Sequence, residues 1–326
     1  MPPSTAELMT LAGIAYGDPG RITGYLATDS LTGGDWSLVW LAAPPDPPVN
    51  FAYLARHRVT GECVLAIRGT YPNPFSPAYW ADGDEDSPFG DMVPWPGSPE
   101  ARISAGTATG FDNLRALTDD AGVTLAGAVA GLPPERSLTV TGHSLGGTLA
   151  PVVALWLAGQ APASAIHIVT FAGMTPGNAA FAALFGPGTA FAGRAIRCFN
   201  TLDTVAYGWD RVFETHDFYE PAPKGGMVVA ALLLATTARL ALGGYGYTAI
   251  GEPVPLPGTV RTPSIGCELI AYVFENLHQH LPDTYLALLG APPLPFTLGL
   301  GSVVVPRGGA GAAAPLHPRW PTYYLG

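Results

Sequence analysis

The chain has 326 residues, of which 48% are hydrophobic and 12% are charged, and its formal net charge at pH 7 is −10. This composition excludes an intrinsically disordered chain, and the acidic balance argues against nucleic acid as a partner, because phosphates require a basic surface. The length predicts one large domain or two small ones, with a core that needs no disulfide or metal. Cys63, Cys198 and Cys267 lie far apart without a CxxC pair, so we expect buried thiols and no zinc site.

The amino-terminal sequence does not resemble a signal peptide, because it has no basic region followed by a long apolar stretch. The most apolar segment, 227–242, contains Arg239 and is too short for a comfortable membrane span. We therefore expect no transmembrane segment. The sequence therefore predicts a cytoplasmic protein, with secretion by another route as the alternative. The sequence does not indicate the oligomeric state.

The pattern of apolar and turn residues predicts strands and helices that alternate along most of the chain. In the first half we expect a helix over 5–17, strands over 36–43, 50–60 and 63–67, a long loop over 71–99 and a helix over 112–132. In the second half we expect strands over 137–141, 166–171, 197–200 and 251–256, and helices over 145–159, 179–185, 227–242, 263–278 and 283–289. This alternation favours an α/β fold whose mostly parallel sheet has helices on both faces.

After residue 290 the composition changes to Pro, Gly and Ala. We therefore expect one domain over 1–290 and a tail over 291–326 that wraps the surface or is partly disordered.

One motif indicates a nucleophile. The segment Gly142-His143-Ser144-Leu145-Gly146-Gly147 matches G-x-S-x-G and lies between an expected strand and an expected helix. A serine on such a sharp turn points outward, where a base can reach its hydroxyl. We therefore predict Ser144 as the nucleophile and the backbone N–H of Leu145 as one donor to an oxyanion. His143 points away from the substrate at such a turn, so we interpret it as structural support.

Together with Ile67-Arg68-Gly69-Thr70 upstream and the segment 170–178 downstream, this motif resembles the class 3 (fungal-type) lipases of the α/β-hydrolase superfamily. The resemblance runs from about residue 7 to residue 289. It implies the α/β-hydrolase fold and a serine hydrolase that cleaves carboxylic esters of lipids without a metal or organic cofactor. The sequence departs from the family where many members have a histidine and this chain has Ser104. The Trp80-Ala81-Asp82 region is also shifted by one position.

A serine hydrolase needs an acid and a base, which follow the nucleophile in the order Asp or Glu, then His. Asp203 comes directly after an expected strand, at the sheet edge where Ser144 also lies, and its segment resembles the family pattern. We predict it as the acid, with the alternatives Asp210 and Asp217.

The base must follow the acid in sequence, and we predict His280 for this role. Pro282 should break the preceding helix, which leaves His280 in a loop, and Tyr285 fits the family's tyrosine after the histidine. The alternatives are His278, His216 and His317. A His-x-His metal site at 278–280 lacks a third ligand with suitable spacing.

A second oxyanion donor should come from the loop that begins at Arg68, where Thr70 resembles the family's oxyanion residue. Two apolar segments are candidates for a lid, 71–99 and 226–243, and the second reads equally as an ordinary core helix.

The sequence thus predicts a triacylglycerol lipase or carboxylesterase that acts through an acyl-enzyme on lipid ester at an oil–water or membrane interface. The alternatives are a phospholipase A1, a polyester or aryl esterase, and a lipid-binding protein without catalysis.

Overall fold

The computed structural model describes residues 3–70, 77–133, 137–160, 165–261, 266–299 and 302–306. The start of the expected loop over 71–99 and the last part of the expected tail, 307–326, lie outside these residues.

Within the described residues, a central sheet has the strand order β1-β2-β3-β6-β7-β8-β9. The strands β1 to β3 pair antiparallel, and the strands from β3 to β9 pair parallel. The strands of this sheet are β1 Trp36–Leu41, β2 Ala52–His57, β3 Cys63–Ile67, β6 Leu138–His143, β7 Ile166–Phe171, β8 Ala195–Asn200 and β9 Glu252–Leu256. Two small hairpins are formed by β4 Val93–Trp95 with β5 Ser98–Ile103, and by β10 Phe296–Gly299 with β11 Ser302–Pro306.

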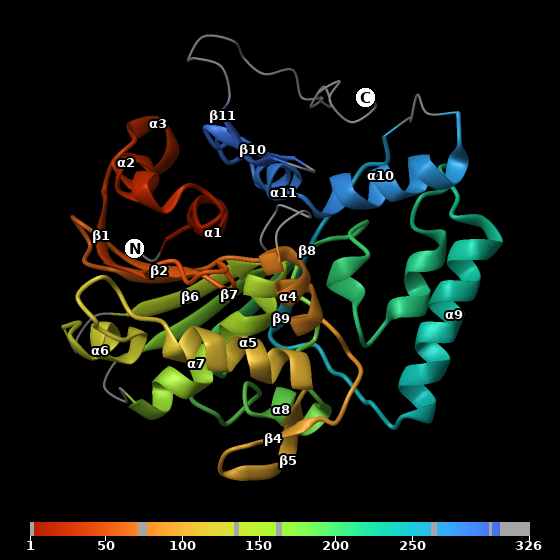
Figure 1. Ribbon diagram of the computed structural model, residues 1–326, viewed down its shortest axis with the longest axis horizontal. Coiled ribbons are helices and arrows are strands. Elements are labelled where there is room, and N and C mark those ends of the chain that lie inside the picture. The colour runs from red at the N-terminus through yellow and green to blue at the C-terminus, as the bar shows by residue number, and fades with distance from the viewer. Residues whose placement is uncertain are drawn as a thin grey trace.

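Helices cover both faces of the sheet, with α1 and α11 on one side and α5 and α7 on the other (Figure 1). The α-helices are α1 Thr5–Ile14, α2 Ile22–Leu26, α3 Asp29–Thr32, α4 Pro77–Glu85, α5 Ala105–Ala116, α6 Leu125–Ala130, α7 Leu145–Gln160, α8 Ala179–Ala183, α9 Gly226–Leu242, α10 Glu268–His280 and α11 Pro282–Leu288. The short 3₁₀ helices are η1 Pro19–Arg21, η2 Val205–Tyr207 and η3 Val212–Asp217.

The central strands are apolar on both faces because both faces are covered. Every residue of β3 and of β6 is buried, as expected for parallel strands between two helical layers. The outer strand β9 carries Pro253 and Pro255, and a proline on an edge strand offers no N–H to a further strand. The expected α/β-hydrolase fold, with a mostly parallel sheet and helices on both faces, is confirmed.

The structure corrects several expected elements. The helix expected over 112–132 is divided into α5 and α6 because two capping residues start separate helices. The Oγ of Ser104 accepts the N–H of Thr107, and the Oγ1 of Thr124 accepts the N–H of Gly127. The segment expected as a loop over 71–99 contains α4 and β4. Cys267, expected to be buried, is exposed.

The packed core continues beyond residue 290. Leu294 and Phe296 are buried in the main core, where the Phe296 ring lies 5.5 Å from the ring of Tyr25. This part of the expected tail therefore covers apolar surface of the first helices. The division of the chain at residue 290 stays a prediction.

We expect Phe296→Ala to lower the free energy of unfolding by about 3–5 kcal/mol, because it removes a buried ring and leaves a cavity. Val59→Ala serves as the control, because Val59 is 79% exposed and such a surface change stays within about 0.5 kcal/mol. Denaturant unfolding of the full chain measures both values. Equal stability of the two variants would show that the segment around Phe296 does not stabilise the domain.

Candidate active site

Ser144 stands on the sharp turn between β6 and α7, as the motif predicts. Its φ is 60°, in the left-handed region that non-glycine residues rarely adopt. Its N–H donates to the carbonyl of Phe171 on β7 at 2.9 Å, which holds the turn against the sheet. A side chain at Gly146 would collide with the backbone of Ile67, so only glycine lets α7 start this close to β3. The Ser144 residue is 6% exposed.

His280 links Ser144 to Asp203. Its Nε2 lies 2.8 Å from the Ser144 Oγ, and its Nδ1 lies 2.9 Å and 3.1 Å from the two carboxylate oxygens of Asp203. With the proton on Nδ1, the ring donates to Asp203 and its Nε2 accepts the Ser144 hydroxyl. The structure thus brings the three residues chosen from the sequence into one hydrogen-bonded series.

His280 does not lie in a loop, as the sequence led us to expect. It is the last residue of α10, and only Leu281 separates it from α11. Pro282 takes the first position of α11, where a proline costs no helical hydrogen bond. The proline therefore ends one helix and starts the next, so that the histidine sits on a helix terminus.

Asp203 is fully buried and follows β8. One of its carboxylate oxygens accepts the N–H of Val205 at 3.0 Å, and the other accepts the Tyr285 hydroxyl at 2.7 Å. The same hydroxyl accepts the N–H of Asn200 at 3.0 Å. These bonds fix the carboxylate toward His280.

The alternative residues have other partners in the described part of the chain. His216 pairs with Asp217 at 2.7 Å, and the Oγ1 of Thr284 donates to the carbonyl of His278. His317 lies outside the described residues. Among the described residues, no group of three or more His, Cys, Asp or Glu side chains is arranged to hold a metal ion.

A buried polar network holds the carboxyl-terminal half of α10, and the sequence analysis did not identify it. The Asn200 side chain donates 2.7 Å to the Gln279 side chain, which in turn donates 2.6 Å to Glu275. Glu275 pairs with the Nε of Arg261 at 3.1 Å. Since Gln279 precedes His280, this network ties the histidine to the end of β8.

His143 stabilises the position of His280 through a hydrogen bond to its backbone. Its Nε2 lies 2.8 Å from the carbonyl of His280, and its Nδ1 lies 3.0 Å from the hydroxyl of Tyr16. Burial lowers the pKa of His143 well below the usual value, so the ring is neutral. It therefore donates from Nε2 to the carbonyl, and its Nδ1 accepts a hydrogen bond from the Tyr16 hydroxyl. No motif in the sequence pointed to Tyr16.

The loop after β3 runs directly beside the turn of Ser144. A side chain at Gly69 would collide with the Tyr16 hydroxyl and the His143 carbonyl. The Oγ1 of Thr70 donates to Asp86 at 3.4 Å. Leu145 is the first residue of α7, and the first N–H groups of a helix have no partner within the helix.

Acidic residues of α4 and the segment after it gather against this loop. The two carboxylate oxygens of Glu85 accept the side-chain N–H groups of Asn50 at 2.7 Å and Asn113 at 2.9 Å. Burial is the main cause that raises the pKa of Glu85 to about 8, and the nearby carboxylate of Asp82 adds to it. Burial, followed by the charge of Glu85, likewise raises the pKa of Asp86. At neutral pH Glu85 is therefore mostly protonated.

The helix α9 stands at the edge of the molecule (Figure 1). Most of its apolar side chains are exposed. Met227 and Leu242 are each 90% exposed and Leu232 is 63% exposed, whereas Leu240 is buried. The interpretation of 227–242 as an ordinary core helix is therefore wrong. No described helix has both the length and the hydropathy that a membrane crossing requires.

Comparisons with known proteins show similarity to lipases. Residues 64–208 match the family model described as lipase (class 3). This segment includes Thr70, Ser144 and Asp203, whereas His280 lies after it. A comparison with the curated proteins found no match.

Two solved structures illustrate the structural similarity. The crystal structure of M37 lipase is 26% identical, with a TM-score of 0.69 over 88% of this chain and 93% of that chain. The triacylglyceride lipase of Rhizomucor miehei is 16% identical, with a TM-score of 0.51 over 77% of this chain and 78% of that chain, a likeness that concerns the fold alone. The central segment of the chain is thus similar to the class 3 lipases, and the fold of the whole chain is similar to that of solved lipase structures.

Proposed function

We propose that this protein hydrolyses carboxylic esters of lipids through an acyl-enzyme on Ser144. The observation that carries the proposal is the hydrogen-bonded series from Ser144 through His280 to Asp203, with 2.8 Å between the Ser144 Oγ and the His280 Nε2. A nucleophile, a base within hydrogen-bond reach and a group that orients the base are what acyl transfer requires. The lipase family and the similarity to M37 lipase support a lipid ester as the substrate.

In the proposed reaction, the Ser144 Oγ attacks the ester carbonyl carbon while its proton passes to the Nε2 of His280. Asp203 stabilises the imidazolium through the Nδ1–H bond. The negative charge that develops on the carbonyl oxygen accepts hydrogen bonds from Thr70 and Leu145. His280 then gives its proton to the leaving alkoxide, and the alcohol departs. Water attacks the acyl-enzyme with His280 as base, which releases the carboxylic acid and restores the Ser144 hydroxyl.

We expect Ser144→Ala and His280→Ala each to lower kcat for ester hydrolysis by at least about 10⁴-fold, because each removes a group that carries the chemistry. Initial rates on a dissolved short-chain ester measure this loss, and a fluorophosphonate probe reports whether the serine is reactive.

His278→Ala is the matched control, since it changes a histidine two positions away and should keep the activity. Labelling of Ser144→Ala by the probe at another serine would refute the assignment of the nucleophile. Equal loss in His278→Ala and His280→Ala would refute the assignment of the base.

The loop that carries Thr70 contacts acidic side chains whose pKa values are raised. Asp86 accepts the Thr70 hydroxyl, and Glu85 lies beside it with a pKa near 8, well above the ordinary value of 4.5. At Glu85 the folded protein therefore binds more of a proton than the unfolded chain does between about pH 4.5 and 8. The contribution of Glu85 to stability consequently falls as the pH rises through this window and levels off above it.

We expect Glu85→Gln to reduce this loss, because the amide keeps the shape of the protonated acid and cannot ionise. The melting temperature at pH 5 and at pH 8 measures the effect, and the wild-type difference should be larger than that of the variant. Glu100→Gln, which changes an exposed acid, should keep the wild-type difference. Identical pH dependence in wild type and Glu85→Gln would refute the linkage to Glu85.

The exposed apolar helix supports action at a lipid surface. Ser144 is 6% exposed, so a bulky substrate reaches its hydroxyl only if a covering segment moves. Among the two lid candidates, α9 presents the larger described apolar surface, and a contiguous apolar surface of this kind is typical of an interaction site. The proposal therefore includes contact between α9 and the lipid interface.

Replacement of Leu232 and Leu234 by Ser should lower the rate on emulsified long-chain ester at least about tenfold, because each side chain loses its burial in lipid. The rate on a dissolved short-chain ester should stay unchanged. Val59→Ser provides an exposed apolar control elsewhere on the surface. Equal loss on both substrates, or none on the emulsion, would contradict an interfacial role of α9.

A further inference from the structure

A second hollow, separate from Ser144, lies beside the outer strands of the sheet. It has a volume of about 410 Å³, within the range of small-molecule sites. Its apolar lining consists of Phe199 on β8, Pro253 and Pro255 on β9, and Ala249 before β9. None of the residues proposed for the reaction takes part in the lining. The polar part of the wall is formed by Arg197, Asp210 and Arg211.

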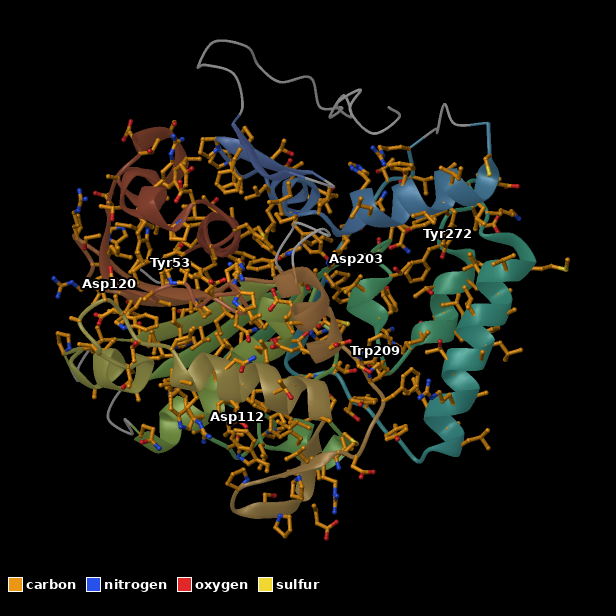
Figure 2. All side chains as sticks on the ribbon, in the orientation of Figure 1. Tyr53, Asp112, Asp120, Asp203, Trp209 and Tyr272 are labelled. Carbon is orange, nitrogen blue, oxygen red and sulfur yellow. The ribbon has the colours of Figure 1, made fainter. Side chains whose placement is uncertain are left out.

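The hollow opens on the sheet face opposite α10 and α11. Side chains alternate along a strand, so Arg197 and Phe199 share one face of β8, whereas Asn200 faces the other. Asn200 bonds to Gln279 of α10 and Tyr285 of α11. A ligand in the hollow is therefore separated from His280 by the sheet. Trp209, the neighbour of Asp210, lies between the sheet and α9 in the view of Figure 2.

Two guanidinium groups line this hollow, and one of them has N–H groups without a partner among the described residues. Arg197 is 5% exposed and lies 4.6 Å over the ring of Phe199, and one of its terminal nitrogens donates to the carbonyl of Ala206. Among the described residues its other N–H groups have no partner. Arg211 lies 4.5 Å over the ring of Tyr207. A guanidinium that lies over an aromatic ring can still donate hydrogen bonds to an anion.

The charges around the hollow are balanced, with two arginines and two acids in its wall and at its rim. Arg211 has a partner at the rim, Glu214 at 3.5 Å, and Asp210 lies in the wall between the arginines. One oxygen of Asp210 is buried without a hydrogen-bond partner among the described residues. Because the two acids already offset the two arginines, a bound carboxylate must be held by hydrogen bonds to the guanidinium groups, and a phosphate dianion would be repelled more strongly than a monoanion.

We infer that this hollow is a second ligand site, which binds a monoanionic amphiphile of the fatty-acid class. The carboxylate lies between Arg197 and Arg211, and the tail covers Phe199 and the two prolines of β9. Charge-assisted hydrogen bonds to arginine orient the head, and burial of the tail supplies most of the binding free energy. The inference goes beyond the proposed function, although a fatty acid is also a product of that reaction.

The test uses the full chain with Ser144→Ala, so that no turnover takes place, and decanoate below its micelle concentration. Isothermal titration should detect a saturable site. Arg211→Gln should weaken decanoate binding about tenfold through loss of a charge-assisted bond. Ala249→Leu should weaken it as well, because the added side chain fills the hollow. Asp210→Asn, which removes a negative charge beside the carboxylate, should tighten it.

Arg115→Gln is the matched control. Arg115 also stacks on an aromatic ring, that of Phe111 at 5.4 Å, and pairs with Asp112 at 2.9 Å, yet it lies on α5, away from the hollow. It should leave decanoate binding unchanged. Binding that Arg211→Gln and Ala249→Leu leave intact would overturn the site, as would binding that never saturates.

Two measurements separate this inference from the proposed function. Arg211→Gln with Ser144 intact should keep its activity on a dissolved short-chain ester, which shows that the variant folds. Saturable binding without any esterase activity of the wild type would refute the proposed function alone. Esterase activity without the arginine-dependent binding would refute the second site alone.

Discussion

The hydrogen bond between Ser144 and His280 joins residues that are 136 positions apart, and the site depends on their meeting within a few tenths of an ångström. Three segments must end at one point, namely β6, β8 and α10. The parallel sheet brings the first two together, because the carboxyl ends of its strands share an edge. The third is a helix end, which the sheet alone does not fix. The network from Asn200 through Gln279 to Glu275 places it.

The local part of this arrangement was predictable from the sequence. The strands over 63–67 and 166–171 have the expected bounds, because short apolar runs that end in glycine or polar residues have few alternatives. Ser144 followed from one motif, since a strand, a turn and a helix start coincide within a few residues. Asp203 followed from its position after a strand. In each case the interactions that determine the local structure act within about ten residues, which is the range over which sequence patterns are informative.

The missed features depend on contacts between distant segments. His280 was expected in a loop because Pro282 breaks helices, but a proline is equally suited to the first turn of α11. The raised pKa of Glu85 arises from burial against Asn50 and Asn113, which no spacing in the sequence reveals. Tyr16 reaches His143 across 127 positions. The exposure of α9 was not predicted either, because an apolar helix has the same sequence pattern in a core and at a surface.

The catalytic site and the cover that we propose in α9 have opposite requirements, and they lie in different segments of the chain. Acyl transfer needs donors and a base that are held still, and here hydrogen bonds and ion pairs such as the partly buried Arg261–Glu275 pair hold them. A cover must move, which requires little buried area. The helix α9 packs on η3 and buries only Leu240 fully, while Arg239 lies 3.8 Å over the ring of Phe89. Since α9 shares no hydrogen bond with the network that places His280 among the described residues, it can shift without moving the base.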